Sequence, residues 1–507
     1  MSFRSPTHSA KAPSSQHDQF RPHSGSPALH VQEKWTLFWV ALHLCFLPWA
    51  LGTMHLWSQC TSLALAVIGF WVAARPRRFT ETDDSGKPVQ LLARPLQRLW
   101  RFPLFWIGLA VLAYIAIQGF NPSSRYKINS SFWWIEPVAN VRWLPSGMDV
   151  PFAKAGPWRS LIVHASLWLT LCTVWIGMLR RLTFRILFTV LAINGVVLAF
   201  VGLAQQLSHA TGIFWTVKSQ SASFIASFIY RNHAGAYFNL ILALTAGLAW
   251  WHFARAERRL AKSSPASVLA FCAVILGITT LFSLSRGATI TMGAFLLVIG
   301  AAFGRALWKQ QSDRRAHVAI LGILALLVGF IGVGLYSLNT ESVRLRIESM
   351  LNDPVASISD RAEAHAAAAE MLVKRPVFGY GAGCFRYGFP EFVSKRPSIY
   401  YSGIANRRFW EHAHNDLLEY PVEFGIAGSA LFLAGIGWLG WQLLRRRFWN
   451  NPLALPVAAG CALTLVHAWG DFVFQNPAIL LTWAVLLLAA GRWAELEHQR
   501  PSDETAR

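Results

Sequence analysis

The chain has 507 residues, of which 54% are hydrophobic and only 14% are charged, and its net charge is +21. In a soluble protein about a quarter of all residues are charged. This composition therefore excludes an ordinary soluble domain and indicates an integral membrane protein. The basic residues lie in short runs between apolar segments, a pattern that orients a chain in a membrane and does not call for a nucleic-acid partner.

The chain begins with a segment rich in Ser, Pro, His and Gln, and we expect residues 1–33 to form a disordered tail. The apolar residues that follow fall into blocks long enough to cross a bilayer as helices. Twelve spans are predicted, at residues 35–54, 56–74, 102–119, 160–178, 186–206, 233–253, 266–284, 287–304, 317–337, 414–443, 453–472 and 477–493. They divide the chain into helices 1–9 within 34–337, helices 10–12 within 414–493, and a tail at 494–507.

The connections between spans alternate between rich and poor in Lys and Arg along the chain. Five connections hold 21 of them in 59 residues, and the five that alternate with these hold 8 in 85 residues. Because basic loops stay on the cytoplasmic side, both termini are predicted to be cytoplasmic. Residues 338–413 then form one large loop on the outer side. The predicted fold is therefore all-α, with about 12 transmembrane helices and this single large outer loop.

Two connections carry local structure of their own. In the large loop, an Ala-rich helix is predicted to open at a capping arrangement, Ser359-Asp360-Arg361-Ala362-Glu363, and to stop before Pro376. The glycines at 379, 381 and 383 then indicate a turn. The connection at 120–159 carries Trp133, Trp134 and Trp143 and is expected to lie on the membrane surface.

The sharpest chemical signal is Glu411-His412-Ala413-His414-Asn415-Asp416, where the outer loop enters span ten. A neutral imidazole here can accept a hydroxyl proton near pH 7. Two other interpretations stay open from the residues alone. The His-Asn pair could simply cap a helix, or His412, His414 and Asp416 could bind a metal, although no further ligand cluster accompanies them.

Arginines form the second signal. Arg286, in Ser285-Arg286-Gly287, is the only charged residue between Lys262 and Arg305. An arginine in that setting is costly unless it faces a partner or a wet cavity, the alternative being a snorkelling side chain that ends span seven. Arg231, in Tyr230-Arg231-Asn232-His233, is predicted at the same outer face.

Two arginines at one membrane face suit a diphosphate, because guanidinium groups bind phosphate oxygens in a bidentate manner. Arg361, in the outer-loop helix, is either a third contact for this group or part of a solvated helix face.

These motifs resemble those of the O-antigen ligase and polymerase superfamily of bacterial membrane glycosyltransferases. His414-Asn415, nine residues, and then Gly425-x-x-Gly428 is similar to the family's His-Asn-x9-Gly-x-x-Gly pattern. Ser285-Arg286-Gly287 resembles its Ser-Arg-Gly element, residues 374–383 its Pro-x-x-Gly-x-Gly turn, and residues 231–233 the element before an earlier helix. The motifs cover about half of the chain, in the family's order.

The resemblance implies a helical membrane glycosyltransferase of the bacterial inner membrane, with its active site in the periplasm. It implies transfer of a glycan from a polyprenyl diphosphate carrier to a hydroxyl of a glycan, lipid A core or protein, without a cofactor, nucleotide sugar or metal. His414 matches the proposed catalytic base. The expected substrate contacts are Arg231, Arg286, Arg361, His412 and Asn415.

Two other functions fit the sequence. A secondary transporter could use outer-face arginines for an anion, although transporters usually place ionisable residues near the bilayer midplane. A non-catalytic partner in polysaccharide assembly fits the topology equally well, but it leaves the convergent His and Arg residues unexplained.

Overall fold

The computed structural model describes residues 29–82, 88–219, 221, 223–260, 263–310, 356–402, 406–407 and 409–498. Several predictions fall outside this part of the chain. They are nearly all of the first tail, the ninth span at 317–337, residues 338–355 of the loop at 338–413, and most of the final tail.

Helices form the body of the described chain, and each coincides with a predicted apolar span. These eleven helices are α1 (Val31–Trp49), α2 (Leu56–Ala74), α3 (Pro103–Phe120), α4 (Pro157–Gly177), α5 (Arg181–Leu207), α6 (Arg231–Arg258), α7 (Ala266–Phe282), α8 (Arg286–Gln310), α15 (Asp416–Arg445), α16 (Ala454–Trp469) and α17 (Pro477–His498). Proline is the first residue of α3, α4 and α17, where its missing N–H costs no helical hydrogen bond.

Eight helices in the described ranges are long and apolar enough to cross a membrane, and α7 and α16 are shorter apolar helices. Many large apolar side chains on their outer faces are exposed, among them Phe200, Ile290, Leu297 and Leu433. Exposed apolar surface on this scale is expected where lipid covers it. The chain is therefore a multi-pass, mostly helical membrane protein, and the full count of twelve spans stays a prediction.

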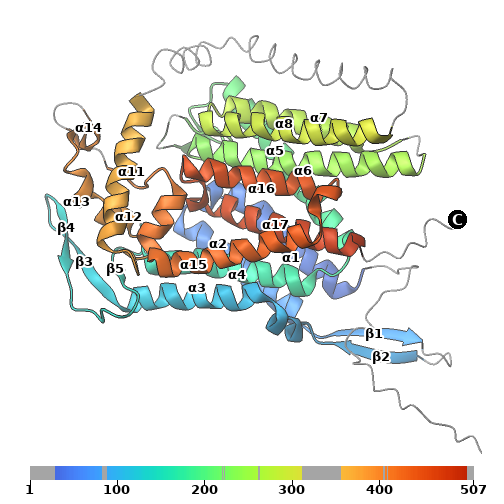
Figure 1. The fold of residues 1–507 in the computed structure, drawn as a ribbon, viewed down its shortest axis with the longest axis horizontal. Helices are drawn as coiled ribbons and strands as arrows, with labels where there is room; N and C mark the ends of the chain where they lie inside the picture. Colours follow the sequence, from blue (N-terminus) through green and yellow to red (C-terminus); the bar gives the residue numbers. More distant parts are fainter. Residues whose placement is uncertain are drawn as a thin grey trace, which may run out of the picture.

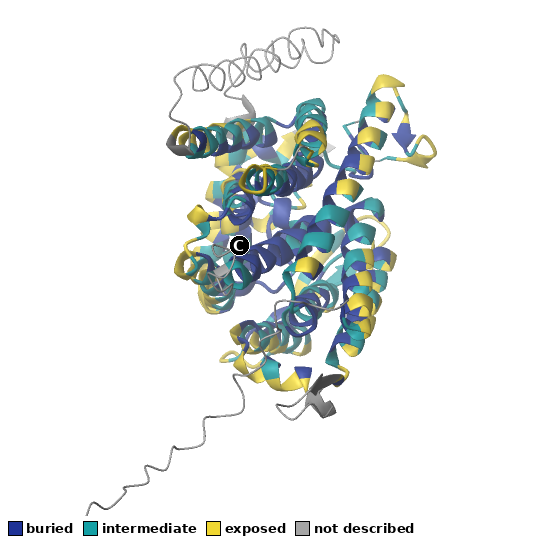
Figure 2. Ribbon diagram, turned by 90° about the vertical axis from the view of Figure 1, so that its right-hand side faces the viewer, coloured by how far each residue is buried: buried dark blue, intermediate teal, exposed yellow. Residues whose placement is uncertain are grey.

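The helices pack side by side around α6 and α17 (Figure 1). In these two helices 78% and 83% of the most apolar stretch is buried, against 28% in α3 and 22% in α8. Figure 2 shows the same arrangement, with buried residues inside the bundle and exposed residues on its outer helices. The helices at the centre therefore have protein on all sides, whereas the outer ones keep one face for lipid.

Short elements gather at one end of the bundle (Figure 1). They are α11 (Ala356–Lys374), α12 (Phe385–Gly388), α13 (Pro390–Val393), α14 (Pro397–Tyr400), β3 (Pro122–Ile128), β4 (Trp133–Pro137) and β5 (Gly147–Asp149). In the sheet, β4 pairs antiparallel with β3, and β3 pairs parallel with β5. Met371, Phe385, Phe389 and Met148 form a second apolar core there, separate from that of the bundle.

The remaining strands form two-stranded antiparallel sheets. They are β1 (Arg77–Thr82) with β2 (Pro88–Ala93), β6 (Gly212–Ile213) with β7 (Val217–Lys218), and β8 (Tyr401–Ser402) with β9 (Asn406–Arg407). The β1–β2 hairpin lies at the opposite end of the bundle from α11–α14 (Figure 1). The all-α prediction thus holds for the bundle but missed the strands in its connections, including the sheet formed within 120–159.

The outer-loop helix corrects one further prediction. The helix α11 begins by Ala356, so Ser359 and Asp360 lie inside its first turns and do not cap it. Ala-rich sequence supports helix on both sides of that site, and the local capping pattern therefore did not decide where the helix begins. The predicted stop before Pro376 is confirmed, because α11 ends at Lys374.

Candidate functional site

The N-terminus of α15 presents the His-Asn pair. Asn415 is the N-cap residue, and its side-chain oxygen accepts the N–H of Leu418 at 3.2 Å. The predicted capping role is therefore confirmed for Asn415. His414 precedes the cap with a φ of 56°, a conformation that is uncommon outside glycine and often found at functional sites.

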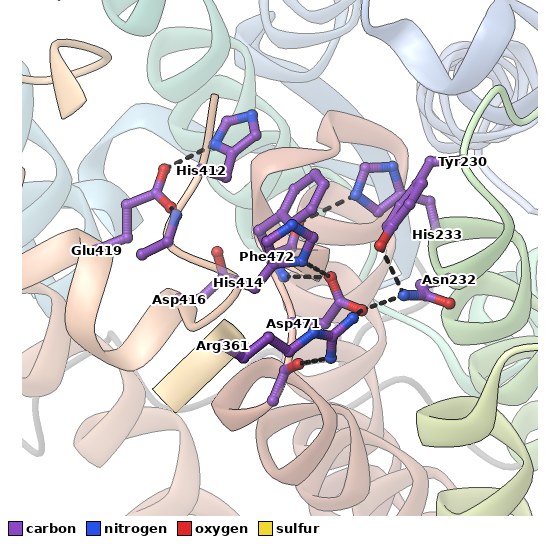
Figure 3. Close-up of polar contacts among 12 residues, drawn as sticks. Tyr230, Asn232, His233, Arg361, His412, His414, Asp416, Glu419, Asp471 and Phe472 are labelled. Carbon is purple, nitrogen blue, oxygen red and sulfur yellow. Dashed lines mark hydrogen bonds and ion pairs between the residues drawn. The ribbon is translucent and has the colours of Figure 1, made fainter. Parts of the chain in front are cut away.

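His414 faces a carboxylate from a distant part of the chain. Its Nδ1 lies 3.4 Å from Oδ1 of Asp471, a residue that is only 2% exposed, in the connection between α16 and α17 (Figure 3). Burial raises the pKa of Asp471, but His414 and Arg361 more than offset this and leave the pKa well below its ordinary value. The carboxylate is therefore ionised at neutral pH.

Two other elements hold Asp471 in place. Arg361, from α11, lies 3.7 Å from Oδ2 of Asp471 and donates to the carbonyl of Gly470 at 2.7 Å. Asn232, in the first turn of α6, donates its amide N–H to the same carboxylate. Arg361 is thus not a freely solvated side chain, because it binds the residue that pairs with His414.

His412 has a different partner. Its Nδ1–H donates to Oε1 of Glu419 at 2.7 Å, and the Ala413 N–H donates to the other carboxylate oxygen at 2.7 Å. Burial lowers the pKa of His412, but the adjacent Glu419 carboxylate outweighs burial, so the pKa is raised above its ordinary value. The two histidines therefore differ in electrostatic setting as well as in partner.

Phe472 joins these groups through ring contacts. His412 stacks on it at 4.4 Å between centroids, and Tyr230 stacks on it at 5.0 Å. His414 and His233 meet its edge at 4.8 and 5.0 Å. The ring thus fixes the spacing between the two histidines and the start of α6, as Figure 3 shows.

The glycine turn docks on a kink in α15. At Gly425 φ is 64° and ψ is −178°, and a β-carbon there would collide with the carbonyl of Val377. The Gly381 N–H donates to the carbonyl of Glu423 at 2.8 Å, and the Gln118 amide of α3 donates to it at 3.2 Å. The glycines of both motifs therefore join the outer loop to α15 and α3.

The two remaining arginines lie at helix starts. Arg231 is the first residue of α6 and is half-buried, and its side chain has no ion pair or hydrogen bond within the described ranges. Arg286 is the first residue of α8. The next residue, Gly287, packs against His467, since a β-carbon there would lie 2.6 Å from its Nε2. Both arginines are therefore at the end of the bundle that holds Asp471.

Asp471 and Phe472 were missed by the sequence reasoning. One signal for Asp471 existed, because no other Asp, Glu, Lys or Arg occurs between Arg447 and Arg492. Nothing in the sequence shows that it meets His414, which lies 57 positions away. The metal interpretation of His412, His414 and Asp416 gains no support, because no group of three metal-ligating side chains occurs in the part of the chain that the structure describes.

Comparison with known proteins identifies one family. Residues 271–433 match the model of the family described as O-Antigen ligase. The resemblance to the O-antigen ligase and polymerase superfamily is confirmed. The match supports an O-antigen ligase-type role in surface polysaccharide assembly. No curated protein matches the chain.

The segment that matches the O-antigen ligase model contains only part of the candidate site. It contains Arg286, Arg361, both histidines and the glycines of the turn and kink, whereas Arg231 and Asp471 lie outside it. The family match thus covers the candidate base but not its carboxylate partner.

Proposed function

We propose that the chain is an inverting, metal-independent glycosyltransferase that moves a glycan from a polyprenyl diphosphate carrier to an acceptor hydroxyl at the periplasmic face. The observation that carries this proposal is the pairing of His414 with the buried, ionised Asp471 beside the start of α15. A histidine whose Nδ1 faces a carboxylate presents Nε2 to a substrate, as in other acid–base pairs.

In the proposed reaction, Nε2 of His414 takes the proton of the acceptor hydroxyl. The hydroxyl oxygen forms a bond to the anomeric carbon of the donor while the bond from that carbon to the phosphate oxygen breaks. The electron pair of the broken bond leaves with the polyprenyl diphosphate. One direct displacement inverts the anomeric centre, and Asp471 stabilises the imidazolium formed on His414.

Negative charge grows on the diphosphate as it leaves, and fixed cations stabilise that charge. Arg286 and Arg231 are the proposed contacts, because both begin helices at this end of the bundle. A helix N-terminus adds backbone N–H groups that favour anions. These groups supply the electrostatic stabilisation that a metal ion supplies in other phosphate sites.

Three expected contacts take more specific roles. Arg361 positions Asp471, since it pairs with that carboxylate and with the neighbouring carbonyl. Asn415 caps α15 and thereby fixes the backbone next to His414. His412, paired with Glu419, supplies positive charge beside the donor and does not act as the base.

The proposed side of the membrane rests on the charge asymmetry of the connections. It requires Ser394, next to α13, to be periplasmic and the β1–β2 connection to be cytoplasmic. A cysteine probe at Ser394 should react with an impermeant reagent in intact spheroplasts. Reaction only after lysis would overturn the orientation and the periplasmic site together.

The function is tested with the full chain in lipid nanodiscs and a polyprenyl diphosphate-linked glycan as donor. Lipid A core, a second donor and an acceptor protein are offered separately, and product is followed with EDTA present. Transfer to one acceptor is expected, together with release of the polyprenyl diphosphate. Activity that EDTA abolishes and a divalent ion restores would overturn the metal-independent mechanism, and uptake of anion without transfer would favour a transporter.

A further inference from the structure

A second cluster of charged residues lies at the opposite end of the bundle from His414. A pocket opens there between α4, α15 and α17. Trp175, Trp438 and Leu488 contribute to its apolar wall, and Gln442, Arg492 and Glu495 form its polar end. The proposed reaction uses none of these residues.

Arg492 is the central cation of this pocket and is only 8% exposed. It donates to Glu495 at 2.5 Å, and its guanidinium lies 4.8 Å from the centre of the Trp175 ring. Arg446, at the end of α15, pairs with the other oxygen of Glu495 at 3.1 Å. The Nε atoms of both arginines are buried and lack a hydrogen-bond partner among the described residues.

Positive charge is in excess around this pocket. Arg98, in the 3₁₀ helix Pro95–Arg101, lies close enough to Arg492 and Arg77 for both to act on it. Burial first, and then these two arginines, lower the pKa of Arg98 to about 10. Glu495 and the Glu33 that pairs with Arg77 do not balance these four arginines, and Glu497, on the same helix as Glu495, is paired with Arg181. An anion would therefore be stabilised here.

We propose that this pocket binds an anionic phospholipid, whose phosphate accepts N–H groups from Arg492 and its neighbouring arginines while an acyl chain lies against the apolar wall. Arg446 and Arg492 share the single carboxylate of Glu495, and phosphate oxygens would supply further charge-assisted hydrogen bonds. Trp441 lies one turn beyond Trp438 on α15 and is exposed, so the apolar wall reaches the surface of the bundle. A lipid phosphate therefore fits better than a free phosphate, which would leave this wall uncovered.

The side of the membrane agrees with this choice. The pocket lies at the end that carries the arginine-rich connections, which the charge asymmetry predicts to be cytoplasmic. The cytoplasmic leaflet is rich in anionic lipids that bind basic pockets between transmembrane helices.

The test measures thermal unfolding of the purified full chain in detergent. Phosphatidylglycerol, phosphatidylcholine or inorganic phosphate is added, because a ligand that binds the folded protein raises Tm. Phosphatidylglycerol should raise Tm well above the effect of phosphatidylcholine. Arg492→Gln should weaken phosphatidylglycerol binding by about tenfold or more, as expected for a lost hydrogen bond to a charged group.

Arg445→Gln is the matched control, because Arg445 lies at the same end of α15 but is exposed and contacts only Trp441 by cation–π. Its phosphatidylglycerol response should equal that of the wild type. If Arg492→Gln fails to fold, Gly491→Leu tests the pocket with its charges intact, because a β-carbon at Gly491 has only Gln442 nearby, at 3.8 Å. Equal responses to the two lipids, an equal response to inorganic phosphate, or an unchanged response in both pocket variants would overturn the proposal.

Discussion

The two halves of the pattern His414-Asn415-x9-Gly425-x-x-Gly428 lie on the same helix, yet the structure gives them different tasks. His414 points to a buried carboxylate supplied by the connection between α16 and α17. Gly425 instead kinks α15 so that the outer-loop turn can dock on it, and Gly428 packs against Tyr114 of α3.

The comparison shows that neighbouring residues of one motif can be required for unrelated reasons. In the proposed reaction the first half sets up proton transfer, whereas the second half holds the outer loop on the bundle. Substitutions should separate the two, because loss of the base leaves folding intact and loss of the kink does not.

The largest effect is expected for His414→Ala. Removing a general base costs about 10²–10⁴-fold in rate, so this variant should insert and bind donor normally but transfer almost no glycan. His412→Ala is the control and should keep measurable activity, because Glu419 and not a substrate proton is its partner. Equal loss in both variants would remove the distinction between the two histidines.

Asp471→Asn should follow, with a rate loss of about 10²-fold, the lower limit for losing a general base. The amide still accepts from Arg361 and Asn232 but no longer stabilises the imidazolium. The loss should appear in kcat with the donor KM unchanged, because the imidazolium forms only during transfer. A lowered Tm with an unchanged kcat would show that Asp471 is only structural.

Arg286→Lys and Arg286→Ala test the proposed diphosphate contact. Loss of a charged hydrogen bond should cost about 1.5–3 kcal/mol, or about 10–150-fold in rate, with alanine slightly worse than lysine. Lysine keeps the charge but not the bidentate fork. A lysine variant with wild-type rate and donor affinity would place the diphosphate elsewhere.

Gly425→Ala addresses the second half of the motif. An alanine there must adopt a φ of 64° and collide with Val377, so folding should be destabilised by about 1–3 kcal/mol. Gly437→Ala is the matched control on the same helix, because a β-carbon there meets nothing within 4 Å. Thermal unfolding of the two purified variants measures the difference, and equal Tm values would contradict the role of the kink.

The smallest effect concerns pH and the pair His412–Glu419. A raised histidine pKa contributes stability that is fully present below its unfolded pKa of about 6.5 and is lost as pH rises through the higher folded pKa. The Tm advantage of the wild type over His412→Gln should therefore be largest in mildly acidic buffer and shrink in alkaline buffer. A constant difference would mean that the ion pair does not contribute.

The sequence by itself determined the bundle and the identity of most of the candidate site. Apolar spans predict helices directly, because each must satisfy its own backbone hydrogen bonds in lipid. The turn at Gly379–Gly383 and the cap at Asn415 were equally local, since backbone geometry alone requires those residue types.

Only the tertiary structure decided what the side chains meet. The pairing of Arg361 with Asp471 was not expected, and Asp471 and Phe472 complete the candidate site although neither belongs to a recognised motif. The small sheet of β3, β4 and β5 was missed for the same reason, because its strands are stabilised by packing against α12. Contacts between distant segments depend on how the helices pack, and helix periodicity does not encode that packing.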